Sequence, residues 1–271
     1  MKYIHPRRYL RICWRPIKDL FFSGINWRRT IVFNFRMLPY DIAKHLPIFL
    51  YGKVDISRCT GKIEFIDDKT ISRGCWIIGQ SACIVNGIDA CYNVTQLAVE
   101  GILRLGISGR IANGCRISVL KGARLSCGDG FLLNADSKIS CYESITIGDG
   151  VHISWEGQIY DTDFHYIISN DGIVKRRNKS ILIGNDAWIG HNVTICKGAV
   201  IGDGCIVAAH SLLNKDFSEY KNCIFAGTPA VLIRTGYKRI YDIAWEKKIA
   251  AYFALNNEYK QCTMNNEGII I

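Results

Sequence analysis

Large aliphatic residues recur at every sixth position in the C-terminal half of the chain. The clearest series is Ile183, Ile189, Ile195, Ile201, Val207 and Leu213. Small or short residues stand four places after its first five members, at Ala187, Val193, Ala199, Cys205 and Ser211. A period of six fits neither the roughly 3.6-residue period of a helix nor the alternation of a long strand. It predicts short strands joined by tight turns, each with one branched side chain pointing inward, so that stacked coils bury a continuous aliphatic column.

The same period extends towards the N-terminus. It links Leu105, Ile111 and Ile117; Leu133, Ile139, Ile145 and Val151; and Ile147, Ile153 and Ile159. Between residues 54 and 100 the rhythm is poor, and we expect an irregular first portion of the same stack there. The rhythm also breaks once over residues 161–180. An excursion of this length from a rigid scaffold is typical of a functional site.

Three regions follow from these patterns. Residues 1–53 form a basic, aromatic N-terminal segment, and residues 54–235 form the repeat domain with its excursion at 161–180. Residues 236–271 begin with a helical stretch, Arg239 to Asn256, and end in a polar tail with an apolar tip. The chain has 271 residues, of which 49% are hydrophobic and 21% are charged, so a sizeable core is expected and wholesale disorder is excluded.

The cysteines and the charge narrow the class of protein further. There are twelve cysteines but no C-x-x-C pair, and no signal-peptide pattern opens the chain, so we expect reduced cysteines in the core of a cytosolic protein. The net charge is +10. Residues 1–53 hold eleven Lys and Arg against two Asp, a net charge of +9, while the remainder is nearly neutral. This distribution argues against a core that binds nucleic acid, which would carry its basic stripe on the folded domain.

Aromatic residues are interleaved with the arginines of the N-terminal segment: Tyr9, Trp14, Phe21, Phe22, Trp27, Phe33 and Phe35. No uncharged run approaches the roughly 20 residues of a membrane-spanning helix. Two interpretations stay open. The segment rests on an anionic membrane surface, which predicts peripheral contact at its inner face, or its aromatic residues pack as a cap on the repeat domain.

The segment IGNDAWIGHNVTICKGAVIGDGCIVAAHSLLNKDF, followed by FAGTPAVLIR, resembles the hexapeptide-repeat acyltransferases in their sugar O-acetyltransferase branch. The run YDTDFHYI before an I-G-x-x-x-W-I-G coil is similar to capsule and O-antigen acetyltransferases. The resemblance implies a mainly β fold, a left-handed parallel β-helix that associates as a homotrimer. It also implies acetyl-CoA as acyl donor, no metal, and as acceptor a sugar hydroxyl of a surface polysaccharide or its precursor.

His165 matches the catalytic histidine of this family and is placed at the excursion. Neutral imidazole suits the removal of a hydroxyl proton at cellular pH. If the chain stays extended over 159–165, Asp161, Asp163 and His165 share one face, and one carboxylate would orient the imidazole. Which aspartate does so is open, and either one would equally serve to hold a sugar hydroxyl or to cap a turn. A metal site at these three residues is not expected, because no further ligand cluster is near.

By resemblance, Trp188, His191 and Ala209 form the wall for the acyl donor, although Trp188 is equally compatible with exterior packing. Asn214, Lys215 and Arg234 match the contacts to the CoA phosphates. Val231 stands where a second basic residue is common, so Lys238 and Arg239 are expected to contribute.

Two other functions remain open: acetylation of a small molecule such as an antibiotic or serine, and a non-catalytic β-helix scaffold. The scaffold is disfavoured because coil stability requires neither His165, Lys215 nor the sequence Gly227–Ala230. The serine acceptor is disfavoured by the lack of a long helical N-terminal domain.

Overall fold

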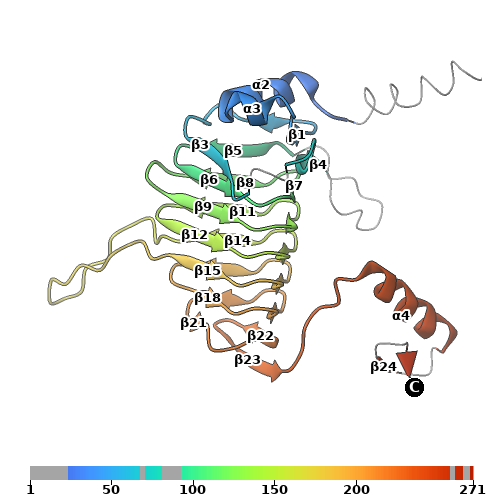
Figure 1. The fold of residues 1–271 in the computed structure, drawn as a ribbon. Coiled ribbons are helices and arrows are strands. Elements are labelled where there is room, and N and C mark those ends of the chain that lie inside the picture. The colour runs from blue at the N-terminus through green and yellow to red at the C-terminus, as the bar shows by residue number, and fades with distance from the viewer. Residues whose placement is uncertain (1–23, 68–70, 81–92, 257–259, 265–268, 271) are drawn as a thin grey trace, which may run out of the picture. The chain divides into compact units, whose positions relative to one another are not determined.

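The computed structural model describes residues 24–67, 71–80, 93–256, 260–264 and 269–270. The chain divides into two compact units, Met1–Tyr237 and Lys238–Ile271. The first unit is a left-handed parallel β-helix, a triangular prism of stacked coils with one strand of each coil on each of three faces (Figure 1). The predicted fold class is thereby confirmed.

The three faces are parallel sheets whose neighbouring strands come from successive coils. The first face contains β1 (Ile48–Leu50), β4 (Trp76–Gln80), β7 (Gly109–Ala112), β10 (Phe131–Leu133), β13 (His152–Ile153), β16 (Trp188–Ile189), β19 (Ile206–Val207), β22 (Cys223–Gly227) and β23 (Ala230–Thr235). The second face contains β2 (Val54–Asp55), β5 (Thr95–Val99), β8 (Arg116–Val119), β11 (Lys138–Cys141), β14 (Gln158–Tyr160), β17 (Thr194–Cys196) and β20 (Leu212–Leu213). The third face contains β3 (Lys62–Phe65), β6 (Ile102–Leu105), β9 (Arg124–Cys127), β12 (Ser144–Ile147), β15 (Ile181–Ile183), β18 (Val200–Ile201) and β21 (Asp216–Phe217).

The six-residue period produces the core. On the second face, one inward side chain from each of six coils stands in register, and each is at most 2% exposed: Leu97, Ile117, Ile139, Ile159, Ile195 and Leu213. Every member of the series from Ile183 to Leu213 is buried, and so are the small residues that follow its first five members. The described residues between 54 and 100 supply β2 to β5, whose strands pair with those of the later coils.

Turns between the third and first faces are joined by a ladder of side chains. The Asp149 carboxylate accepts the Asp129 N–H at 2.8 Å, and the Asn185 amide oxygen accepts the Asp149 N–H at 2.9 Å. Asp203 in turn accepts the Asn185 N–H at 2.9 Å and pairs with Lys221 at 3.2 Å. The hydrogen bond from the Asn185 backbone, assisted by Lys221, holds the pKa of Asp203 below its usual value. The ladder therefore satisfies backbone donors that the parallel sheets leave at this corner.

The first coil is covered by part of the N-terminal segment, namely α2 (Trp27–Met37) and α3 (Tyr40–Ala43). The Asn34 side chain donates to the Ile48 carbonyl at 2.7 Å and accepts the Ile48 N–H at 3.2 Å. A buried side chain therefore provides the hydrogen-bond partners of Ile48 on the edge strand β1. Phe33 is fully buried, whereas Phe35 is 47% exposed. Four aromatic residues of the predicted basic segment lie outside the described residues: Tyr9, Trp14, Phe21 and Phe22. The coil stack itself starts at β1, within residues 1–53.

The opposite end of the stack is closed by the antiparallel pair β22 and β23. The second unit contains α4 (Ile243–Leu255), which falls within the predicted helical stretch, and the pair β24 (Thr263–Met264) and β25 (Ile269–Ile270). Across the described part of the chain, no helix combines the length and the apolar character needed to cross a membrane.

The nine cysteines among the described residues carry free thiols, and most of them are buried. Burial raises the pKa of Cys115 to about 12. Burial, together with the neighbouring Asp161, raises the pKa of Cys141 to about 12 as well. These thiols therefore behave as small core side chains.

Replacing Ile195 by Ala should lower the free energy of unfolding by about 2–5 kcal/mol, because it leaves a cavity in the buried column. Leu182→Ala is the matched control: Leu182 points outward from β15 and is 46% exposed, so its loss should cost less than about 0.5 kcal/mol. Equilibrium urea unfolding at one protein concentration measures both. Equal effects of the two substitutions would contradict the assigned register.

Candidate active site

Residues 161–180 form an arm at the corner between the second and third faces. The arm leaves the prism after β14, projects away from it and returns into β15 (Figure 1). Its two limbs run antiparallel, with bridges between Thr162 and Asn178 and between Ile168 and Val174. The break in the six-residue rhythm therefore corresponds to an ordered pair of limbs that departs from one corner.

Asp161 anchors the start of the arm to the preceding coil. Its side chain is fully buried, and its carboxylate oxygens accept the backbone N–H groups of Tyr142, Glu143 and Ser144 at 2.7–2.9 Å. A carboxylate committed to three backbone donors stabilises a turn, which is one of the roles that the sequence left open.

The expectation of an extended chain over 159–165 is wrong. The strand β14 ends at Tyr160, and Phe164 takes a left-handed backbone conformation with φ of 62°. The Thr162 hydroxyl accepts the Phe164 N–H at 3.0 Å, which stabilises this turn. The turn breaks the alternation of side chains, so Asp161 is buried while Asp163 and His165 are exposed.

The base of the arm is held by residues from both neighbouring coils. Lys197 forms an ion pair with Asp163 on the outgoing limb and donates to the Arg176 carbonyl on the returning limb at 3.0 Å. Glu143 accepts hydrogen bonds from Arg176 at 3.0 Å and from Ser180 at 3.2 Å. Lys197 and Glu143 were not predicted from the sequence, because nothing local to either residue shows a contact that joins separate coils.

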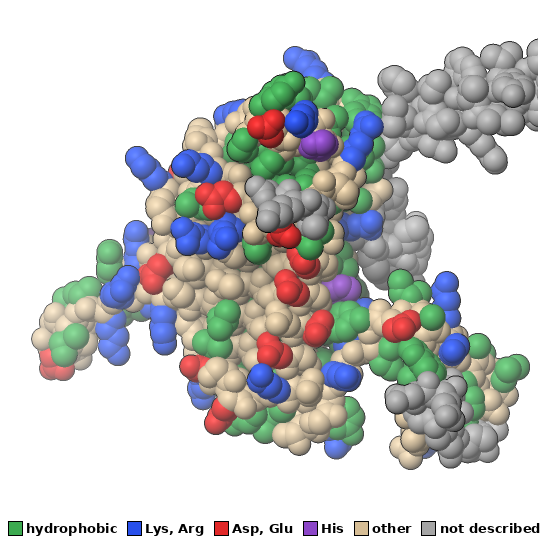
Figure 2. All heavy atoms as spheres, viewed as in Figure 1, with side chains coloured by type: hydrophobic (Ala, Val, Ile, Leu, Met, Phe, Trp, Pro, Cys, Tyr) green, Lys and Arg blue, Asp and Glu red, His purple; other side chains and the backbone are tan. Residues whose placement is uncertain are grey.

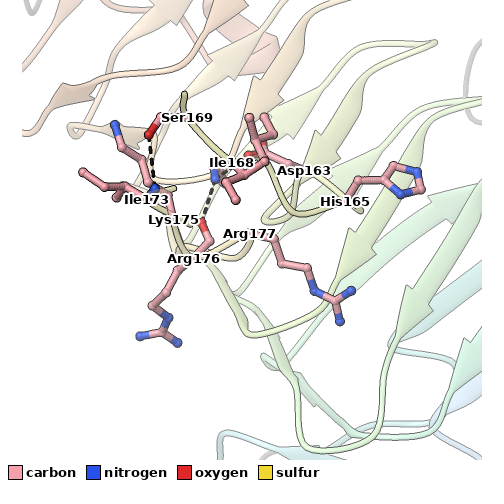
Figure 3. Close-up of a pocket in the computed structure, with 10 residues that line it drawn as sticks. Asp163, His165, Ile168, Ser169, Ile173, Lys175, Arg176 and Arg177 are labelled. Atoms are coloured by element: carbon pink, nitrogen blue, oxygen red, sulfur yellow. Dashed lines mark hydrogen bonds and ion pairs between the residues drawn. The ribbon is translucent and has the colours of Figure 1, made fainter. Parts of the chain in front are cut away.

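His165 lies at the edge of a pocket of about 310 Å³ that the two limbs of the arm enclose. Its imidazole points away from Asp163 and the rest of the pocket lining (Figure 3). The His165 N–H donates to the Asp163 carbonyl at 2.7 Å, but within the described residues the ring itself has no hydrogen-bond partner. The ring is therefore exposed on a fixed backbone, and neither aspartate contacts it.

The residues assigned to the acyl-donor wall lie elsewhere on the prism. Trp188 points outward from β16 on the first face and is 36% exposed. His191 and Ala209 occupy turns at the corner between the first and second faces. There the Trp155 ring stacks on His191 with centroids 5.0 Å apart, and the His210 ring meets His191 edge-on at 4.8 Å. Trp155 and His210 thus form a ring cluster with His191, and neither was singled out from the sequence.

The residues assigned to the CoA phosphates also lie in different parts of the structure. Asn214 and Lys215 occupy the turn between β20 and β21, at the same corner as the arm and one coil beyond Lys197. Arg234 is exposed on β23, whereas Lys238 and Arg239 belong to the second unit. A single prism thus places His165 at one corner and His191 with Ala209 at another.

No group of three or more His, Cys, Asp or Glu side chains suited to a metal ion occurs in the part of the chain that the structure describes.

Comparisons with known proteins agree with this geometry. Residues 180–215 match the family described as bacterial transferase hexapeptide (six repeats). An uncharacterised 24.8 kDa protein in the cps region of Klebsiella pneumoniae is 31% identical over 78% of this chain and 87% of its own length. A probable acetyltransferase of Mycobacterium tuberculosis is 30% identical over 70% of this chain, which spans 58% of that relative. A putative lipopolysaccharide biosynthesis O-acetyl transferase of Escherichia coli is 26% identical over 50% of this chain and 72% of its own length. The chain belongs to the hexapeptide-repeat family of acetyltransferases, as the sequence predicted.

Proposed function

We propose that the protein is an O-acetyltransferase that moves an acetyl group from acetyl-CoA to a sugar hydroxyl of a surface polysaccharide or its precursor. His165 acts as the general base. The observation that carries the proposal is an exposed imidazole on a backbone fixed by the base of the arm, at the break in the regular coils between β14 and β15. Coil stability requires neither the arm nor its histidine.

In this reaction the imidazole removes the proton of the acceptor hydroxyl as its oxygen attacks the thioester carbonyl carbon of acetyl-CoA. The tetrahedral intermediate collapses with cleavage of the carbon–sulfur bond, and the imidazolium returns the proton to the departing thiolate. The products are the O-acetyl sugar and free CoA. The negative charge on the carbonyl oxygen requires fixed hydrogen-bond donors, a role that we assign to backbone N–H groups of the coils.

Of the two aspartates, we assign the support of His165 to Asp163. Its backbone carbonyl accepts the His165 N–H, and its carboxylate ties the outgoing limb to Lys197 on the next coil. Asp161 supports the site only indirectly, by holding the start of the arm. In this scheme Lys215 and Arg234 meet the phosphates of CoA, together with Asn214.

A carbohydrate acceptor is supported by the similarity to the Escherichia coli protein named for lipopolysaccharide biosynthesis. The pocket at the arm also suits polar ligands. It combines Asp163, Lys175, Arg177 and Ser169, which provide hydrogen-bond donors and acceptors close to the exposed histidine.

We propose a homotrimer with active sites between subunits. One chain holds His165 and the donor wall at different corners, so a second copy is required to bring them together. The arm also carries large apolar side chains that are at least 54% exposed: Tyr166, Ile167, Ile168, Ile173 and Val174. Figure 2 shows hydrophobic side chains on the arm that projects from the prism, together with Lys and Arg side chains. An exposed apolar patch of this kind is typical of an interface.

We also propose peripheral contact of the N-terminal segment with an anionic membrane at its inner face, where lipid-linked glycans and CoA meet. The segment combines its basic residues with interspersed aromatic residues, which suits electrostatic attraction and shallow insertion. The helix α2, which contributes to the cap, begins at Trp27.

Replacing His165 by Asn should lower kcat at least about a hundredfold, because the general base is lost, while CoA binding and thermal stability stay unchanged. Release of free thiol from acetyl-CoA in the presence of polysaccharide from the host measures the reaction, and NMR locates the new O-acetyl groups. His45→Asn, at the end of α3, is the matched control and should retain full activity. Near wild-type turnover by His165→Asn would show that another group is the base.

Mixing two inactive variants tests the shared site. His165→Asn lacks the base, and Ala209→Trp blocks the donor wall at an exposed turn. Subunits unfolded together and refolded as mixed trimers should regain roughly a quarter of wild-type activity, because only sites that join an intact histidine to an intact wall work. The solution mass should be three times the 30.6 kDa of one chain. A monomer with full activity, or no recovery on mixing, would exclude the shared site.

Sedimentation with vesicles tests the membrane contact. The protein should sediment with phosphatidylcholine vesicles only when phosphatidylserine is included, and salt should release it, because the attraction is electrostatic. Deleting residues 1–23, which contain six Lys and Arg against one Asp, should abolish binding while leaving the capping helices in place. Absence of sedimentation at low salt would leave only the cap function for this segment.

A further inference from the structure

A groove runs along the outer face of the second sheet, above the arm, with a volume of about 460 Å³. One wall is a column of outward side chains from consecutive coils: Gln96 pairs in register with Arg116, and Arg116 with Lys138. All three side chains are exposed. Because neighbouring strands are about 4.8 Å apart, the column repeats its hydrogen-bond donors at that spacing.

The floor of the groove is made of small residues. These residues are Ala98, Ser118 and Ser140, which stand in register two residues further along the same strands. Because these side chains are small, they leave a trough between the column of Gln96, Arg116 and Lys138 and the corner of the prism. The hydroxyl groups of Ser118 and Ser140 form no hydrogen bond with any described residue, so both are available to a ligand in the trough.

The lower end of the groove is aromatic and is formed by Tyr160 and Phe164. Tyr160 continues the floor column on β14, and its ring meets the Phe164 ring edge-on at 5.7 Å. Phe164 lines the groove as a result of its left-handed backbone, and it directly precedes His165. The groove therefore leads from the first coils to the arm, over roughly 14 Å for three strand spacings.

The positive charge of the groove is not neutralised from within. Arg116 and Lys138 form no ion pair with a described residue. Arg58, at the upper rim, pairs with Glu100 at 2.7 Å. Arg116 and Lys138 also line a second pocket together with Asp136 and Glu156, and Asp136 there accepts a hydrogen bond from Asn93 at 2.7 Å.

We infer that this groove binds the acceptor as an extended acidic glycan chain and delivers one of its hydroxyl groups to His165. The inference rests on the proposed function and adds the class of acceptor. A polymer that repeats its carboxylates matches a wall that repeats its cations, serine hydroxyls meet sugar hydroxyls, and Tyr160 with Phe164 offers aromatic rings to an apolar sugar face. Several weak contacts along one chain then act together, although a single exposed ion pair contributes little.

Binding to fluorescein-labelled polygalacturonate, a linear uronic acid polymer, tests the groove without any acetyl transfer. Fluorescence anisotropy at low salt should show a Kd at least about tenfold lower than for the same polymer with its carboxyl groups reduced. Arg116→Gln with Lys138→Gln should raise the Kd for the acidic polymer at least about tenfold and leave the neutral polymer unaffected. Arg116→Lys with Lys138→Arg retains the charges and should retain most of the binding.

Two further variants distinguish binding in the groove from a general effect of the protein's charge. Lys247→Gln with Lys260→Gln removes the same charge from the second unit and should bind like the wild type. Ser118→Trp fills the trough without changing charge and should abolish binding of the acidic polymer. Unchanged binding by Ser118→Trp or by the Arg116 and Lys138 double variant would overturn the inference, as would equal affinity for a single-stranded oligonucleotide.

The outcome is independent of the catalytic assignment. His165→Asn should bind polygalacturonate like the wild type, since its imidazole is not part of the groove wall. If that variant keeps its acetyl transfer, the proposed base is wrong while the binding result stands. If it loses transfer and the groove variants bind normally, the base stands and the acceptor class is wrong.

Discussion

Parallel pairing of each strand with the equivalent strand of the next coil is the interaction on which the rest of the structure depends. It satisfies the backbone of every interior coil and fixes which residues stand above one another. Each strand turns one or two large side chains into the prism, such as Ile145 and Ile147 on β12, so the inward positions become aliphatic columns. The outward positions are aligned by the same pairing. The surface column of Gln96, Arg116 and Lys138 therefore follows the same register as the core behind it.

This pairing also decides where extra residues can be inserted. Ile145 on β12 pairs with Ile181 on β15 although the arm intervenes in the chain, so the insertion at a corner leaves the register intact. An inserted segment that nothing tied to the coils would be disordered, because ordering it costs conformational entropy. Asp161 ties its start to the coil above, and Lys197 ties both limbs to the coil below. The scaffold thus transmits its rigidity to the backbone of His165 while leaving the imidazole free.

The sequence predicts those parts of the structure that repeat. The inward positions could be predicted because the fold requires an aliphatic side chain there at every sixth residue. The arm could be predicted because this period is interrupted there. The turn at Phe164 was missed, since Phe has no preference for a left-handed backbone and the conformation depends on Thr162 and on ring contacts with Tyr160 and Tyr142. The role of Asn34 in satisfying β1 was equally hidden, because its partner is defined only once the first coil exists.

The distribution of exposed groups is the reason why we propose a functional site shared between two prisms. A column packed with aliphatic side chains has no interior space for a ligand, so every reactive group must lie on an outer face or at a corner. His165 and the ring pair of Trp155 and His191 occupy two such corners, which the flat faces keep apart. The arm meanwhile exposes about two-thirds of Ile167 and Ile168 to water. Apolar burial contributes about 25 cal/mol per Å², so docking of this arm on another prism is favourable for the same reason that the core is. In the proposed trimer, the association that covers the arm is also the one that brings the imidazole of His165 to the corner of a second copy.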